Sequence, residues 1–328
     1  MKYRNLGKHG LKLSEISIGT MHHGSYLSKE KSHKVLAEAI NQGINFIDCA
    51  NRYGIYDASN LPVEERTRAE IVLGEFIQDY DRADLVISSK VFYQMRDTPN
   101  SGGLSRKHIR EEIRDTLKYL QTDYLDLYFC HRPHRETPLK ETILTISNLI
   151  DEGYVNYWGT SWWPPVLVER TIALAKELGA HPPAAEQPPY SMRGRFIEVD
   201  LLELAKYHGL GLTTFEALAS GFLTGKYLEG VPKGSRMEIQ NFDREDIYAV
   251  YKKICGPLME IAEELEISLN HLAIAWALRH PEVTTTIMGA TKPKQVISNV
   301  EASGIELKED TLERIEEILD NKPKTNFR

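Results

Sequence analysis

Apolar and polar positions alternate along the chain in two recurring patterns. Longer segments with apolar residues three and four positions apart, such as Ser105–Leu120 and Leu139–Ile150, are typical of helices with one buried face. Between such segments, short and largely apolar runs have the length and composition of buried strands. These predicted strands are Glu15–Gly19, Asn45–Ala50, Leu85–Lys90, Tyr124–His131, Val155–Ser161, Ala184–Tyr190, Gly211–Ala217 and Thr284–Gly289. Such alternation favours a parallel sheet that is covered by helices.

Eight strand–helix units predict an α/β fold in which the parallel sheet closes into a (β/α)8 TIM barrel. An open, doubly wound sheet is the alternative, and it is disfavoured because no G-x-G-x-x-G motif follows the first strand. Outside the repeat, Tyr3–Leu6 and Leu11–Ser14 predict an N-terminal β-hairpin, and Lys308–Leu319 predicts an extra C-terminal helix. The polar segment Leu228–Glu245 is predicted to be a long functional or mobile loop. No linker interrupts the pattern, so we expect residues 1–328 to form a single domain.

Charge and composition narrow the range of functions. A formal net charge of −7, from 40 basic and 47 acidic residues, argues against nucleic acid as the main partner. Cys49, Cys130 and Cys255 show no C-x-x-C spacing, so neither a disulfide framework nor a structural zinc site is expected. No secretory signal follows Met1, and no run reaches the roughly 18 apolar residues of a membrane span. We therefore expect a cytoplasmic enzyme that binds no membrane.

Four polar residues stand at or just after the carboxyl ends of predicted strands. Asp48 ends one apolar run and Tyr53 follows it closely, while Lys90 and His131 end the next two runs. In a parallel barrel the carboxyl ends of the strands meet at one rim, where such barrels hold their chemistry. Taken singly, each residue is more typical of a cap, a packed side chain or a solvated charge. Because all four share matching positions, we expect them to converge into a group for proton transfer.

The segments that carry these residues resemble the signature segments of the aldo-keto reductases. They are Phe46-Ile47-Asp48-Cys49-Ala50 with Tyr53, Ile87-Ser88-Ser89-Lys90, and Tyr124-Leu125-Asp126-Leu127-Tyr128 followed by His131. The resemblance covers the whole chain, and it is greatest for the branch that contains the voltage-gated potassium channel β subunits and their bacterial relatives. That closer likeness lies in Ser101-Gly102-Gly103-Leu104-Ser105, Tyr157-Trp158-Gly159-Thr160-Ser161 and Asn321-Lys322-Pro323. The channel subunits carry Asn at the position of His131, and this departure moves the chain toward the true reductases.

The resemblance implies NADPH-dependent reduction of an aldehyde or ketone to an alcohol by hydride transfer. In that reaction Tyr53 is the general acid, Lys90 and Asp48 tune it, and His131 orients the substrate carbonyl. The chemistry of the residues agrees with these roles, because free tyrosine has a pKa near ~10 and is a poor acid at neutral pH. A nearby ammonium stabilises the phenolate and lowers that pKa, and Asp48 is the counter-ion that a buried Lys90 needs.

The resemblance also implies a set of residues that bind NADP(H). Ser161 and Gln187 correspond to residues that hold the nicotinamide carboxamide, and Phe215 corresponds to the ring that stacks on the nicotinamide. Lys226 and the pair Ser235-Arg236 correspond to phosphate contacts, and Arg236 is expected to read the 2′-phosphate. The full expected set is Thr20, Met21, Asp48, Ser161, Gln187, Phe215, Glu216, Ala217, Leu218, Ala219, Ser220, Lys226, Ser235, Arg236, Gly289, Thr291, Gln295, Ser298 and Asn299.

Some positions depart from the family pattern, and others match it. Glu216 and Ala217 stand where Ser and Pro are usual, and Trp162 replaces the usual polar residue after Ser161. A carboxylate beside a pyrophosphate would repel it, so we expect Glu216 to point away or to pair with a cation. At the adenosine end, Gln295 and Asn299 match adenine contacts on one face of a helix whose N-terminus attracts phosphate.

Two other functions stay open at this point. One is a slow, cofactor-binding redox sensor or auxiliary subunit, and the other is a Schiff-base aldolase that uses Lys90. No metal site is expected, because His22-His23 and the pair His131 and His134 lack a third ligand at recognisable spacing. The expected partner is a small carbonyl substrate, and association into a homo-oligomer stays open. Aromatic residues expected near the rim favour small or partly apolar carbonyl compounds: Tyr26, Trp162 and Trp163.

Overall fold

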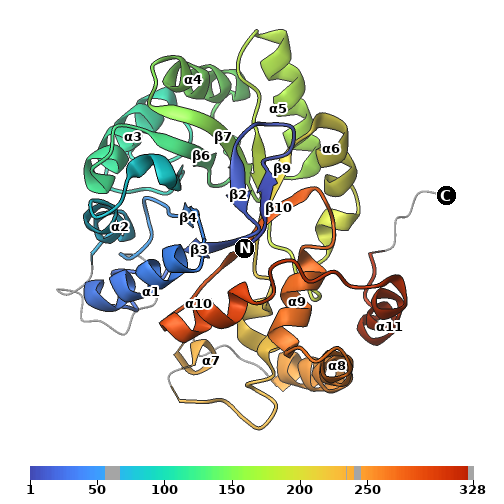
Figure 1. Cartoon of the computed structure of the whole chain (residues 1–328). Helices are drawn as coiled ribbons and strands as arrows, with labels where there is room; N and C mark the ends of the chain where they lie inside the picture. Colours follow the sequence, from blue (N-terminus) through green and yellow to red (C-terminus); the bar gives the residue numbers. More distant parts are fainter. Residues whose placement is uncertain (56–66, 234, 240–244, 324–328) are drawn as a thin grey trace.

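In the part of the chain that the structure describes, eight parallel strands form a closed barrel, which confirms the predicted (β/α)8 fold (Figure 1). The computed structural model describes residues 1–55, 67–233, 235–239 and 245–323. Neighbouring strands follow the order β10-β3-β4-β5-β6-β7-β8-β9, so the last strand pairs with the first. The strands are β3 (Ile16–Gly19), β4 (Phe46–Asp48), β5 (Val86–Val91), β6 (Leu125–Cys130), β7 (Val155–Ser161), β8 (Ala185–Gln187), β9 (Gly211–Phe215) and β10 (Val283–Met288).

The predicted strands all occur, but several are shorter than the apolar runs suggested. The run that was predicted to continue to Tyr190 ends as β8 at Gln187. Pro188 and Pro189 follow, and proline has no N–H to donate to a strand ladder. Similarly, β4 ends at Asp48, and the chain then turns away toward Tyr53.

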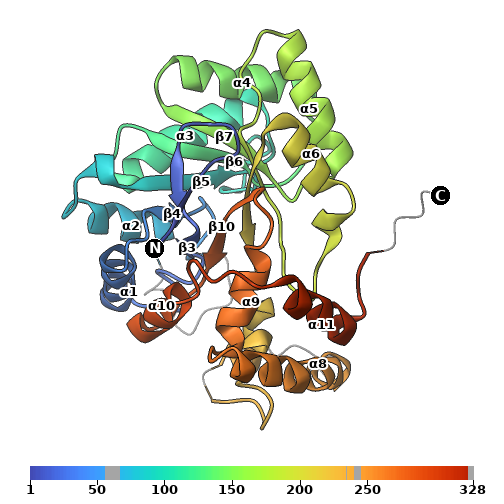
Figure 2. The same cartoon turned by 45° about the vertical axis from the view of Figure 1, so that its right-hand side comes forward.

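Helices cover the outside of the barrel (Figures 1 and 2). The helix α3 begins after Ser105, whose side chain accepts a hydrogen bond from the backbone N–H of His108 at 3.3 Å. It ends where Gln121 adopts a left-handed backbone with φ of 53°. The helices are α1 (Lys29–Asn41), α2 (Ala69–Ile77), α3 (Arg106–Leu120), α4 (Leu139–Asp151), α5 (Pro165–Glu177), α6 (Leu201–His208), α7 (Arg236–Ile239), α8 (Glu245–Glu264), α9 (Leu269–Ala277), α10 (Pro293–Val300) and α11 (Glu309–Leu319).

Two of the segments outside the strand–helix repeat are the C-terminal helix and the segment Leu228–Glu245. The extra C-terminal helix is confirmed as α11, which packs beside α8 and is tied to it by an ion pair of Arg314 with Glu264 at 2.6 Å. The predicted loop Leu228–Glu245 was wrong in part, because the short helix α7 forms within it. Residues 234 and 240–244 of that segment lie outside the described residues.

The predicted N-terminal hairpin is confirmed, and it closes the amino-terminal end of the barrel. Strands β1 (Tyr3–Asn5) and β2 (Lys12–Ser14) pair antiparallel. Leu6 and Leu13 of the hairpin pack in one buried cluster with Phe46 and Leu127, which lie on barrel strands. A plug of this kind leaves the carboxyl ends of the strands as the open end of the barrel.

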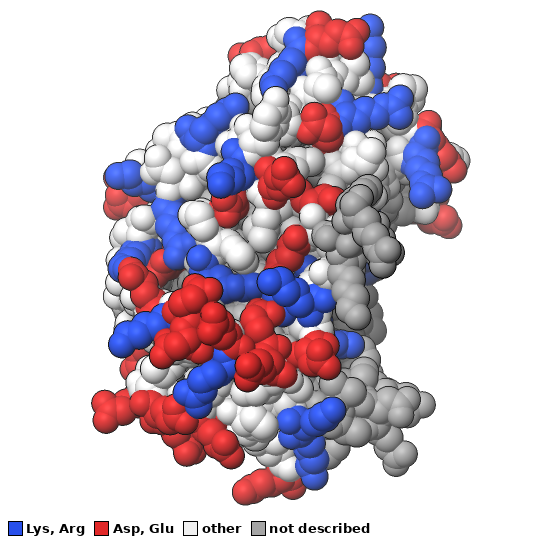
Figure 3. All heavy atoms as spheres, turned by 90° about the vertical axis from the view of Figure 1, so that its right-hand side faces the viewer, with Lys and Arg blue, Asp and Glu red and all other residues white. Residues whose placement is uncertain are grey.

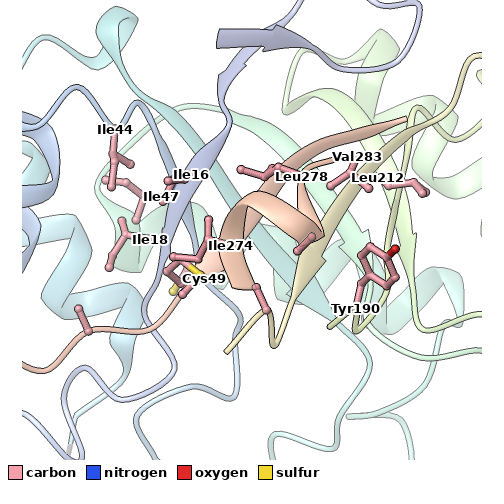
Figure 4. Close-up of a cluster of buried hydrophobic side chains, with 14 of the residues drawn as sticks. Ile16, Ile18, Ile44, Ile47, Cys49, Tyr190, Leu212, Ile274, Leu278 and Val283 are labelled. Carbon is pink, nitrogen blue, oxygen red and sulfur yellow. The ribbon is translucent and has the colours of Figure 1, made fainter. Parts of the chain in front are cut away.

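Alternation along the strands decides which side chains enter the barrel. Ile16, Ile18 and Ile47 belong to the large apolar layer between strands and helices (Figure 4). Phe46, on the other side of the same strand as Ile47, belongs to the interior cluster. The same alternation directs the next interior positions, Asp48 on β4 and Lys90 on β5, toward the barrel axis. No helix in the described ranges is both long enough and apolar enough to cross a membrane.

Candidate active site

A cavity of about 860 Å³ opens at the carboxyl ends of the strands. Its volume lies within the range that small-molecule sites usually have. Tyr53, from the loop after β4, and His131, directly after β6, both line it. The structure therefore brings together at one rim the polar residues that follow different strands in the sequence.

Lys90 is fully buried, and its ammonium has three acceptors. Lys90 Nζ lies 2.6 Å from Asp48 Oδ2, 2.7 Å from the carbonyl oxygen of Cys49 and 3.3 Å from the hydroxyl of Tyr53. These three contacts match the three N–H donors of an ammonium group. Burial lowers the pKa of Lys90, and the carboxylate of Asp48 opposes that shift. The arrangement holds a positive charge directly against the phenol of Tyr53.

Asp48 is held from several strands at once. Its Oδ1 accepts hydrogen bonds from Ser88 Oγ on β5 at 2.8 Å and from Gln187 Nε2 on β8 at 2.9 Å. The other oxygen, Oδ2, accepts from Lys90. Because these three donors are themselves buried, the carboxylate has a fixed orientation.

Tyr53 is positioned by the loop that follows β4. The backbone N–H of Tyr53 donates to the carbonyl of Ala50 at 3.0 Å, and the N–H of Ala69 donates to the carbonyl of Tyr53 at 2.9 Å. Gly54 follows with φ of +88°, and a Cβ on it would lie 2.3 Å from the carbonyl oxygen of Thr67. Only glycine allows this close approach of the two backbone segments.

His131 is 5% exposed and stands between two tyrosine rings. The centre of its ring lies 5.9 Å from that of Tyr53 and 5.1 Å from that of Tyr93, and both contacts are edge-on. Desolvation lowers the pKa of His131 well below its usual value, and the nearby charges of Lys90, Arg132 and Arg52 lower it further. The imidazole is therefore neutral at physiological pH, which leaves it able to donate one hydrogen bond and to accept another.

Most residues of the expected NADP(H) set line the same cavity. They are Met21, Asp48, Ser161, Gln187, Phe215, Glu216, Ala217, Leu218, Ser220, Lys226, Ser235, Gly289, Thr291, Gln295, Ser298 and Asn299. Thr20 and Ala219 are buried and do not line it. Thr20 instead donates from its hydroxyl to the carbonyl of Asp48 at 3.0 Å. The backbone of Arg236 lies at the start of α7, and its side chain is outside the described residues.

The cap of α10 involves one of the expected adenine contacts. Gln295 Oε1 accepts hydrogen bonds from the backbone N–H groups of Thr291 at 2.7 Å and Lys292 at 3.0 Å, and from the Thr291 hydroxyl at 3.1 Å. The side chain therefore folds back over the first turn of its own helix. Asn299, four residues later, is buried and also lines the cavity.

The segment after β9 has an unusual backbone that the sequence did not indicate. Glu216, Ala219 and Ser220 have positive φ values of 70°, 46° and 60°, and Gly221 has a φ of 94°. Left-handed residues other than glycine are strained and concentrate at functional sites. Glu216 is exposed on the cavity wall and has no ion pair with any residue in the described ranges. That it points away from the phosphate groups or pairs with a cation stays a prediction.

Positive charge concentrates in the cavity although the chain is acidic overall. Figure 3 shows acidic side chains gathered over the lower half of the face that carries α8 and α11. Cations dominate the described lining, which holds Arg52, Arg132, Lys226, Lys233, Lys292 and Lys294 against the carboxylates of Asp48 and Glu216. A pocket of this polarity attracts anionic groups. The sequence reasoning missed Arg52, Tyr93, Arg132 and Lys233 as lining residues.

Glu186 supports the cavity wall from behind. It lies on β8, is fully buried, and accepts hydrogen bonds from the hydroxyl of Thr160 and, at 3.0 Å, from the backbone N–H of Trp163. Desolvation raises the pKa of Glu186 to about 7. The turn that it holds also carries Trp162, which has a φ of 56° and whose ring packs edge-on against Phe215 at 6.2 Å. Across the described parts of the chain, no three His, Cys, Asp or Glu side chains gather as metal ligands.

This barrel, with its rim of Asp48, Tyr53, Lys90 and His131, has the architecture of a family of oxidoreductases. The sequence model of the Aldo/keto reductase family matches residues 15–320, and the chain belongs to that family. The chain is 38% identical over 335 residues to a probable voltage-gated potassium channel subunit beta of Arabidopsis thaliana, covering 99% of this chain and 98% of the relative. Corresponding proteins of Oryza sativa and Schizosaccharomyces pombe are 38% and 36% identical, with at least 94% of each chain covered. The predicted resemblance is confirmed.

Glu186→Gln should make protein stability depend less on pH. Unfolded Glu186 loses its proton near its ordinary pKa of 4.5, whereas the folded protein keeps the proton until about pH 7. Ionisation therefore penalises the folded state as pH rises through this window, and Gln cannot ionise. The free energy of unfolding of the variant, minus that of the wild type, should rise between pH 4.5 and 7 by up to about 3 kcal/mol.

Urea unfolding at a series of pH values measures this difference. Glu263→Gln on the exposed face of α8 is the matched control and should give a flat difference. A flat profile for Glu186→Gln as well would show that Glu186 does not titrate in this range.

Proposed function

We propose that the protein is an NADPH-dependent reductase that converts an aldehyde or ketone into an alcohol. The observation that carries the proposal is the hydroxyl of Tyr53, 3.3 Å from the buried ammonium of Lys90, in a cavity that His131 also lines. A phenol beside a fixed positive charge is a proton donor suited to neutral pH. Membership of the aldo/keto reductase family supports the same reaction class.

The cavity fits a nicotinamide dinucleotide in several respects. Its lining extends from Tyr53 and His131 to Gln295 and Asn299, so it has a catalytic end and a distant end. Lysines on the cavity lining suit phosphate groups, and Phe215 offers an aromatic ring on the wall. When bound, the reduced nicotinamide supplies the hydride.

Each polar residue of the rim then has a separate task. Tyr53 donates its proton to the substrate oxygen as negative charge develops there. Lys90 stabilises the phenolate that remains, and Asp48 keeps Lys90 charged in a buried position. Neutral His131 donates a hydrogen bond from its ring N–H that orients the carbonyl.

Preference for the 2′-phosphorylated cofactor is the finer part of the proposal. It rests on the resemblance that assigns Lys226, Ser235 and Arg236 to phosphate groups. Ser235 and Lys226 line the cavity, as do Lys292 and Lys294. These cations favour a cofactor that carries an additional phosphate group over one that lacks it.

Two alternative functions were left open by the sequence, and the structure argues against one of them. A Schiff-base aldolase needs an accessible, neutral amine, whereas Lys90 is fully buried and paired with Asp48. The second alternative is an auxiliary subunit that binds the cofactor and turns over slowly, and similarity to probable and putative potassium channel β subunits favours it. The rate of turnover separates this alternative from the reductase.

Purified protein should oxidise NADPH when it is given small aldehydes, without added metal. The reason is that the rim supplies its own proton donor and needs no metal to polarise the carbonyl. Absorbance of NADPH measures the rate, with chelator present and absent. Turnover numbers on the usual enzyme scale of about 1 s⁻¹ or more support a reductase. Binding of NADPH without aldehyde-dependent oxidation would instead support the auxiliary subunit.

Tyr53→Phe should lower the turnover rate by at least ~100-fold, the usual scale for loss of a general acid. The affinity for NADPH should barely change, because the hydroxyl faces the substrate rather than the cofactor. Stopped-flow turnover and fluorescence titration of NADPH measure the two quantities. Tyr80→Phe, on a tyrosine outside the cavity lining, is the control. Near-normal turnover of Tyr53→Phe would remove Tyr53 from the role of acid.

A further inference from the structure

Two arginines are direct sequence neighbours of residues in the proposed catalytic group. Arg52 directly precedes Tyr53, and Arg132 directly follows His131. Both line the cavity, and both lower the pKa of His131 through their charge. Their guanidinium groups therefore lie close to the place where a carbonyl would meet Tyr53 and His131.

Each guanidinium is held by an aromatic face. The Cζ of Arg52 lies 3.9 Å from the centre of the Tyr93 ring, and that of Arg132 lies 4.8 Å from the centre of the Trp162 ring. Arg132 also donates from Nη1 to the carbonyl of His131 at 2.6 Å. Stacking of this kind fixes the plane of a guanidinium and leaves N–H groups on its edge free for an anion.

Neither arginine has a carboxylate partner at ion-pair distance in the described ranges. The carboxyl of Glu186 acts on Arg132 electrostatically, but its oxygens are occupied by Thr160 and the backbone of Trp163. A half-buried guanidinium that no carboxylate in the described ranges pairs with is suited to a ligand that brings a negative charge. The lysines on the cavity wall suit the cofactor phosphates, so these two cations are left for the substrate.

We propose that Arg52 and Arg132 form an anion-binding clamp beside the reacting carbonyl, so that the substrate is an aldehyde or ketone bearing a carboxylate or a phosphate. This inference rests on the proposed reductase function. A planar guanidinium holds either anion in a two-pronged grip, and the chemistry shared by the two groups is their negative charge. The aromatic residues Trp162 and Tyr93 thus act as supports for the clamp, and Tyr93 also lines the cavity.

Matched substrate pairs test the clamp. Succinic semialdehyde is compared with its uncharged methyl ester, and glycolaldehyde phosphate with glycolaldehyde, by measuring kcat/KM with NADPH. The charged member should be preferred by about 10-fold or more, the scale of a charge-assisted hydrogen bond. Preference in the first pair alone identifies a carboxylate as the anion, and preference in the second pair alone identifies a phosphate.

Variants then assign the preference to the arginines. Arg52→Gln and Arg132→Gln should each lower the charged-to-neutral ratio of kcat/KM by about 10-fold, mainly through KM for the charged substrate. Arg132→Lys should restore part of the ratio, since it keeps the charge but loses the planar grip. Arg135→Gln is the control, because Arg135 is exposed on the same loop and does not line the cavity. Thermal unfolding checks that each variant is folded.

The possible results separate this inference from the function on which it rests. Equal kcat/KM within both pairs would overturn the clamp while leaving the reductase function in place. A preference that survives both Gln substitutions would overturn the assignment to these arginines. If no aldehyde is reduced by the wild type, the proposed function fails and the clamp fails with it.

Discussion

The site depends on one buried ion pair, that of Lys90 with Asp48. An ammonium in the barrel interior loses the solvation of water, and a fully buried charge is tolerated only with a partner and further hydrogen bonds. Asp48 at 2.6 Å and the carbonyl of Cys49 at 2.7 Å meet that requirement. The third donor of Lys90 is then directed at the phenol of Tyr53. The buried ammonium, which needs these partners, therefore also positions the proton donor. Through Gln187, the same pair connects β4 and β5 to β8 on the far side of the barrel.

Alternation along short strands places this pair. Phe46 fills the barrel interior and Ile47 packs against the helices, so Asp48 must return to the interior. The hairpin closes the opposite end with Leu6 and Leu13. Apolar packing therefore fills the barrel at the amino-terminal end, and the charged residues lie where the barrel interior meets the cavity. The same alternation of residues thus closes one end of the barrel and leaves polar side chains accessible to a ligand at the other.

The sequence predicted the barrel, the hairpin, α11 and the convergence of Asp48, Tyr53, Lys90 and His131, because each depends on strand order and on local pattern. It did not predict features that depend on contacts between distant loops. Glu186 reads as an ordinary polar strand residue until the fold places the turn of Trp162 and Trp163 over it. Arg52 and Arg132 read as solvated charges until Tyr93 and Trp162 are seen to support them. The left-handed backbone after β9 involves Glu216 and Ala219, which are not residues that signal such a conformation.

If Lys90 contributes to catalysis only by stabilising the phenolate of Tyr53, a double-mutant cycle on the turnover rate will show it. Lys90→Met leaves Asp48 with the donors Ser88 and Gln187, so the variant should fold, which circular dichroism checks. If Lys90 serves to stabilise the phenolate, the double variant Lys90→Met, Tyr53→Phe should turn over within about 3-fold of Tyr53→Phe alone, since residues that act as a unit are not additive. Losses that multiply in the double variant would show instead that Lys90 contributes to turnover independently of Tyr53.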